Sequence, residues 1–157
     1  MLDYTSVITE EKSYSGLQMK EVKPIMKLII RGKKREFLSA IGKSLNLLLP
    51  TEANTSSRSD KLTALWLSPD EWMVYSNETI NSESNEYETE NLLNKNISKT
   101  NLGAVTNVTD QFVLINIKGD KIFELFETGS PFNFNDFRYK KGSVTQTILA
   151  KIDVVIH

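Results

Sequence analysis

The chain has 157 residues and a formal net charge of -1, with 39% hydrophobic and 25% charged residues. This length predicts one domain or two small half-domains, and the composition is that of a folded protein with a core. The near-neutral charge predicts no binding to nucleic acid, and the absence of an apolar run of about 18 residues excludes a membrane span. The polar N-terminus lacks a secretory signal pattern, so we expect a cytoplasmic protein.

Two absences restrict the chemistry that this chain can perform. It has no cysteine, and its single histidine is the last residue, His157. Thiol nucleophiles and thiolate metal sites are therefore excluded, and a terminal histidine is expected to be mobile rather than catalytic. The isolated acids Asp110 and Asp120 have no partner at a diagnostic spacing. We predict no catalytic, cofactor-binding or metal-binding residue.

The first part of the chain predicts an arm followed by a strand and a helix. Residues 1–24 carry little apolar periodicity and indicate an extended N-terminal arm. Residues 25–31, rich in branched side chains, predict a strand. Apolar residues then recur every three or four positions over 37–48, which is typical of a helix. A loop rich in Ser, Thr and Asn is predicted over 51–61.

The middle of the chain predicts a hairpin, a second helix and another strand. The strands at 62–67 and 72–75 flank Ser68-Pro69-Asp70-Glu71, in which proline at the second position favours a tight turn. A helix around 87–97 and a strand over 103–109 follow. The order strand, helix, strand, strand, helix, strand predicts an α+β fold with a two-layer ferredoxin-like (split βαβ) unit.

The last part of the chain repeats this order in a shorter form. A strand at 112–118 precedes a helix at 122–126, and two strands are predicted over 143–150 and 152–156. The second unit is therefore incomplete. The predicted organisation is an arm at 1–24, a first unit at 25–109 and a second, partial unit at 110–157 packed on the first.

Two groups of residues are candidates for contact with another protein. A dense basic stretch follows the first strand and is either a solvated face or a contact for an acidic partner surface or a polyanionic tail. The two tryptophans flank the tight turn, where they are either core residues or interface anchors. The candidates for a partner interface are Trp66, Trp72, Asp70, Arg31, Lys33, Lys34 and Arg35.

Three segments resemble the gamma subunits of sarcosine oxidase. Residues 65–72, LWLSPDEW, resemble the family's L-W-L-G-P-D-E-W segment, with Ser68 in place of the common glycine. Residues 108–119 resemble its V-x-D-x-S…L-x-L-x-G segment. Residues 129–133 and 142–150 resemble its C-P-L-D-L and G-x-x-x-Q-T-x-L-A patterns, with Ser130 replacing the cysteine.

The resemblance implies the fold of the folate-binding glycine-cleavage aminomethyltransferase family. It also implies a non-catalytic accessory subunit of a heterotetrameric enzyme that demethylates sarcosine to glycine and passes the one-carbon unit to tetrahydrofolate. The alpha and beta subunits are the implied partners and are expected to carry FAD, FMN, NAD and tetrahydrofolate, with none on this chain.

Two other functions stay open at this point. One is a stand-alone folate-binding protein of the same fold, but the repair proteins of that kind carry K-G-C-x-x-G-Q, whereas here Ser143 follows Lys141-Gly142. The other is an unrelated ferredoxin-like regulatory module that binds a small effector.

Overall fold

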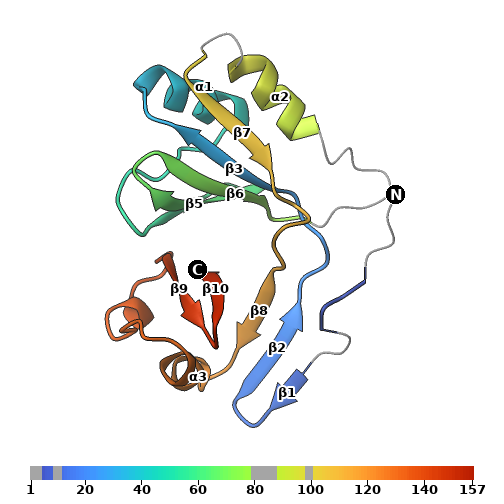
Figure 1. The fold of residues 1–157 in the computed structure, drawn as a ribbon, viewed down its shortest axis with the longest axis vertical. Helices are drawn as coiled ribbons and strands as arrows, with labels where there is room; N and C mark the ends of the chain where they lie inside the picture. Colours follow the sequence, from blue (N-terminus) through green and yellow to red (C-terminus); the bar gives the residue numbers. More distant parts are fainter. Residues whose placement is uncertain (1–4, 9–11, 79–87, 98–100) are drawn as a thin grey trace.

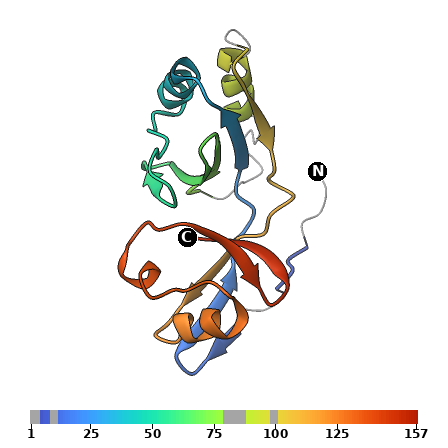
Figure 2. The same ribbon diagram turned by 60° about the vertical axis from the view of Figure 1, so that its left-hand side comes forward.

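The computed structural model describes residues 5–8, 12–78, 88–97 and 101–157, which form two lobes (Figure 1). The five-stranded lobe contains the elements from β3 to β7, and the two-sheet lobe contains β1, β2 and the elements from β8 to β10. Figure 2 shows the lobes stacked on each other and joined by the segments before β3 and after β7. The predicted mixture of helices with antiparallel sheets is confirmed.

The five-stranded lobe is one antiparallel sheet with both of its helices on the same face (Figure 1). The strand order is β4-β5-β6-β3-β7, so β3 lies between β6 and β7. Its elements are β3 (Lys27–Gly32), α1 (Arg35–Leu45), β4 (Ser56–Arg58), β5 (Leu62–Ser68), β6 (Glu71–Ser76), α2 (Glu88–Ile97) and β7 (Gly103–Asn107).

Alternation along the strands gives this sheet two apolar faces. On β3, Leu28 and Ile30 belong to the core that the helices cover, whereas Ile29 packs on the opposite face. That opposite face holds a second, smaller cluster, to which Val144 and Val155 of the two-sheet lobe contribute. The sheet is therefore packed between its own helices and the other lobe.

Helix α1 forms because its apolar residues share one side. Phe37, Ile41 and Leu45 are four residues apart and all are buried. Asn46 ends the helix in the left-handed conformation with φ of 49°, a conformation that asparagine tolerates better than most residues. The helix thereby stops before the segment that leads to Pro50, in which Leu47 and Leu49 are buried and Leu48 is exposed.

The two-sheet lobe divides its strands between two small sheets. One has the order β1-β2-β8 and the other is the hairpin β9–β10. The N-terminal residues are thus joined to a strand almost one hundred positions later, with Gln18 opposite Lys118 and Glu21 opposite Ile115. The elements are β1 (Lys12–Tyr14), β2 (Leu17–Glu21), β8 (Ile115–Lys118), α3 (Ile122–Gly129), the 3-10 helix η1 (Phe137–Tyr139), β9 (Thr145–Leu149) and β10 (Ile152–Ile156).

Aromatic side chains pack together in this lobe, whose two sheets are small. Phe134 is fully buried, and its ring lies 5.3 Å from that of Phe126 and 4.9 Å from that of Phe132. These separations are in the favourable range for offset or edge-to-face contact. The aromatic cluster holds α3 against the segment that leads to η1.

Most predicted elements are present, and the structure adds three strands where the sequence predicted an arm and a loop. The two helices of the first unit and the strands around the tight turn lie where the sequence predicted them. Strands β1 and β2 were not predicted, and β4 occupies part of the expected loop at 51–61. Among the described residues, no helix is long and apolar enough to cross a membrane.

Candidate functional site

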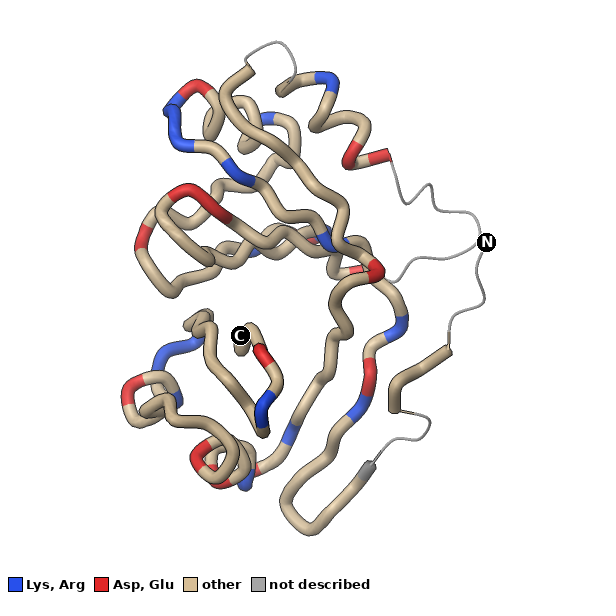
Figure 3. Tube along the Cα trace, viewed as in Figure 1, with Lys and Arg blue, Asp and Glu red and all other residues tan. Residues whose placement is uncertain are grey.

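The predicted basic stretch lies against the acidic turn between β5 and β6 (Figure 3). An Nη atom of Arg31 is 3.8 Å from a carboxylate oxygen of Glu71, and Nζ of Lys33 is 3.4 Å from one of Asp70. The backbone N–H of Gly32 also donates to the carbonyl of Asp70. The structure therefore brings four of the charged residues of this corner together, and part of the basic charge is compensated within the chain.

The carboxylate of Asp70 is held in its charged form. The Ser68 hydroxyl donates to it at 2.9 Å, and this hydrogen bond, helped by Lys33 and Arg31, lowers the pKa of Asp70. Lys34 and Arg35 begin α1 and are exposed. Arg31 and Lys33 are exposed as well, so all four basic candidates can be reached from the surface at this corner.

The two predicted tryptophans occupy different environments. Trp72 is only 2% exposed, and its indole N–H donates to the carbonyl of Pro50 at 2.7 Å. It is therefore a core residue rather than a surface anchor, because its apolar ring and its one polar atom are both satisfied inside the lobe. Trp66 lies directly opposite on β5 and is partly buried against the same core.

The last residue joins the two lobes, contrary to the expectation of a mobile histidine. Nε2 of His157 is 2.9 Å from the Ser56 hydroxyl, and Nδ1 is 3.0 Å from the Tyr75 hydroxyl. Ser56 donates its own proton to the carbonyl of Gly142, so it accepts from Nε2, and Nδ1 accepts from Tyr75. Burial, with Arg58 adding to it, lowers the pKa of His157.

A buried lysine lies at the other junction between the lobes. Lys27 is 5% exposed, and its ammonium group donates to the carbonyls of Ile25 and Thr109 at 3.3 and 3.1 Å. Burial lowers the pKa of Lys27, and nearby Asp110 opposes this shift. This contact could not be predicted, because Lys27 stands in an ordinary strand pattern.

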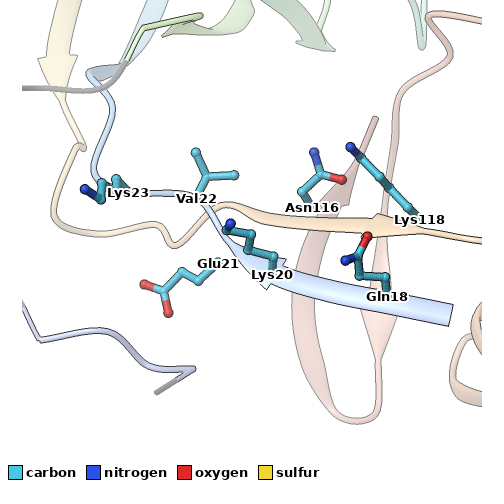
Figure 4. Close-up of a pocket in the computed structure, with 7 residues that line it drawn as sticks. All are labelled: Gln18, Lys20, Glu21, Val22, Lys23, Asn116 and Lys118. Carbon is cyan, nitrogen blue, oxygen red and sulfur yellow. The ribbon is translucent and has the colours of Figure 1, made fainter. Parts of the chain in front are cut away.

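A shallow cleft of about 520 Å³ lies along β2, β8 and the segment after β2 (Figure 4). Asn116 and Lys118 point to one side of the strands, and Glu21 points to the other. The Glu21 carboxylate accepts hydrogen bonds from the Ser6 hydroxyl and the Ile8 backbone. The lining residues are Gln18, Lys20, Glu21, Val22, Lys23, Asn116 and Lys118.

The polar side chains of these places mainly contact other groups of the same chain. Nowhere in the described part of the chain do three metal-binding side chains gather. The polar groups either compensate one another, as at the β5–β6 turn, or join the lobes, as at His157.

Comparison with known proteins shows the family to which this chain is similar. A family model described as "Sarcosine oxidase, gamma subunit family" matches residues 32–157. Among solved structures, the chain is similar to a chain of the heterotetrameric sarcosine oxidase from Corynebacterium sp. U-96, in complex with pyrrole 2-carboxylate. That match has a TM-score of 0.76 and 17% identity and covers 88% of this chain and 68% of the other. No curated protein matches.

Proposed function

Because the chain belongs to the sarcosine oxidase gamma subunit family, we propose that it is a non-catalytic accessory subunit of a multi-subunit, flavin-dependent sarcosine oxidase. The observation that carries this proposal is the family match over residues 32–157, which spans elements of both lobes. The fold likeness to a chain of a heterotetrameric sarcosine oxidase supports it.

The proposed partners are the alpha and beta subunits of the oxidase in the cytoplasm. They would carry FAD, FMN, NAD and tetrahydrofolate and oxidise sarcosine to glycine, while this chain contributes binding surface. The exposed apolar side chains of the two-sheet lobe favour such a role, because large apolar patches on a soluble chain mark contact sites for other proteins.

The strand order supports the finer fold assignment that the family suggests. In the five-stranded lobe, β3, α1, β5, β6, α2 and β7 follow one another, and their strands lie in the order β5-β6-β3-β7. This is the arrangement of a split βαβ, ferredoxin-like unit. We propose that β8, α3, β9 and β10 form a second, partial unit, with the domain boundary near residue 110.

A reconstitution experiment tests the function. The tagged chain would be mixed with alpha and beta subunits prepared without it, recovered by its tag, and assayed for flavin absorbance and sarcosine-dependent peroxide. We expect a yellow, active complex, whereas the chain alone is colourless and inactive. A matched control uses an unrelated tagged protein of similar size and charge in place of the chain.

Two outcomes contradict the proposal. The chain fails as a subunit if it recovers no flavoprotein while remaining folded by circular dichroism. If it then binds tetrahydrofolate by itself, measured by calorimetry, the stand-alone folate-binding function replaces the subunit function.

A further inference from the structure

Strand β8 has one open edge, unlike the corresponding strand of the other lobe. In the five-stranded lobe, β3 pairs with β6 on one side and with β7 on the other. Within the described residues, β8 pairs with β2 alone and lies at the end of its sheet. Each of these strands leads into a helix, α1 or α3, but β8 has one neighbour in its sheet where β3 has two.

The hydrogen-bond pattern shows which backbone groups of β8 are open. The backbone N–H of Val22 donates to the carbonyl of Leu114 at 2.9 Å, and these two residues continue the register of β2 and β8. In an antiparallel ladder, the groups of successive residues point alternately toward and away from the neighbouring strand. Those of Leu114 and Asn116 therefore point to β2, and those of Ile115 and Ile117 point outward.

Apolar side chains accompany this open edge. Phe112 and Val113, just before β8, and Ile115, its first residue, are 43%, 49% and 41% exposed. An exposed apolar edge strand is a template for pairing with another strand, and soluble proteins avoid leaving one uncovered. The edge of β8 is therefore a candidate surface for pairing with another strand.

The two faces of β8 restrict what could cover it. Ile115 and Ile117 lie on one face, opposite Glu21 and Met19 of β2, and Asn116 and Lys118 lie on the other face, along the cleft (Figure 4). A strand added at this edge would alternate in the same way. Its best match carries apolar residues beside Ile115 and acidic or polar residues beside Lys118.

We propose that the outer edge of β8, Ile115–Lys118, with the exposed Phe112 and Val113 just before it, pairs with an extended strand of a partner subunit of the oxidase. This inference rests on the proposed function, because the family consists of subunits and the similar solved chain belongs to a heterotetramer. Main-chain hydrogen bonds at Ile115 and Ile117 supply affinity, and the alternating side chains select the partner strand.

Hydrogen–deuterium exchange with residue-resolved mass spectrometry tests the pairing directly. In the free chain, the amide of Ile115 should exchange quickly and that of Asn116 slowly, because only the latter faces β2. In the reconstituted complex, the Ile115 amide should slow at least about tenfold, since backbone hydrogen bonds protect amides. Slow exchange at Ile115 in the free chain would show that the edge is already paired within this chain and would overturn the proposal.

Two substitutions test the contribution of the edge to assembly. Ile115→Pro removes an outward donor but no bond to β2, so the fold should tolerate it. Ile115→Lys places a charge in the apolar contact. Each should weaken recovery of the partner subunits at least about tenfold, as loss of a central interface residue does. Leu92→Lys, at a residue on α2 that is similarly exposed at 45%, is the matched control and should bind as the wild type does.

The outcomes separate this inference from the function on which it rests. If the wild-type chain and both Ile115 variants recover active oxidase equally well, the proposed function stands, and the proposed pairing at the β8 edge is wrong. If the wild-type chain recovers no oxidase, the function fails and the inference falls with it. Concentration-dependent self-association that the Ile115 variants abolish would assign the edge to a second copy of this chain instead.

Discussion

The two lobes differ in how completely their strands are paired and their apolar side chains are buried. In the five-stranded lobe, β3 and β6 are paired on both sides, and the helices bury one face of the sheet. The two-sheet lobe divides its strands into sheets of three and two, and it carries most of the exposed large apolar side chains. These are Tyr14, Phe112, Val113, Ile115, Tyr139, Ile148 and Ile152, against Leu48 and Leu92 in the five-stranded lobe, while Val7 lies in the N-terminal segment before β1.

This difference suggests that one lobe contributes most of the stability and the other most of the surface for binding other proteins. Burial of apolar surface is the main favourable contribution to folding, so the five-stranded lobe should dominate the free energy of unfolding. Unpaired edges and exposed apolar residues contribute little to stability, but they are the features from which protein interfaces are built. Variants in each lobe can test this division.

The largest expected effect comes from the core of the five-stranded lobe. Trp72→Ala should lower the free energy of unfolding by about 3–5 kcal/mol, because it leaves a cavity in the core. It also leaves the carbonyl of Pro50 without its indole donor. Tyr139→Ala in the two-sheet lobe, at a residue that is 83% exposed, should change it by less than about 0.5 kcal/mol. Urea unfolding measures both, and equal effects would remove the distinction between the lobes.

A pair of glycine substitutions measures how tightly the five-stranded lobe is packed. At Gly103, a Cβ would overlap the backbone oxygen of Arg31 and the ring of Phe37, so Gly103→Ala should cost about 1–3 kcal/mol. At Gly42, within α1, a Cβ would lie 3.4 Å from the carbonyl of Leu47, an ordinary contact. Gly42→Ala should therefore stabilise the protein by about 0.5–1 kcal/mol through helix propensity. Thermal unfolding of both variants should shift in opposite directions, and a neutral Gly103→Ala would indicate looser packing.

Sequence reasoning was most reliable where the signal is local. The four-residue spacing of Phe37, Ile41 and Leu45 predicts α1, and Ser68-Pro69-Asp70-Glu71 predicts the turn between β5 and β6. Strand β2 was missed although Leu17-Gln18-Met19-Lys20 alternates apolar and polar residues, because the stretch is short and its partner β8 lies far along the chain. Long-range pairing depends on the whole fold, and local propensity carries little information about it.

The candidate site was predicted only in part, for a related reason. The sequence identified the charged residues of the corner at the β5–β6 turn, because they stand close together or within a recognisable motif. It left Trp72 as either a core residue or an interface anchor, and only the folded chain shows that Pro50 accepts its indole hydrogen. It also expected His157 to be mobile, since nothing near a terminus indicates contacts with Ser56 and Tyr75.

A smaller destabilisation than those of Trp72→Ala and Gly103→Ala is expected at the junction between the lobes. His157→Ala removes hydrogen bonds to Ser56 and Tyr75 and should lower the free energy of unfolding by about 0.5–1.5 kcal/mol at neutral pH. The difference in free energy of unfolding between the wild type and this variant should also depend on pH, because the pKa of His157 lies below its usual 6.5 in the folded protein. The unfolded chain therefore binds more protons as the pH falls, so the contribution is fully present above about pH 6.5 and is lost below it.

Urea unfolding at a series of pH values between about 5 and 8 measures this contribution. The variant should show a shallower decline in stability toward acid than the wild type. Ile152→Ala, at the other end of β10 where the side chain is 67% exposed, is the control and should keep the wild-type pH dependence. Identical pH profiles for the wild type and the His157 variant would mean that the ring does not hold the lobes together, and the junction would then depend on the apolar contacts of Val144 and Val155.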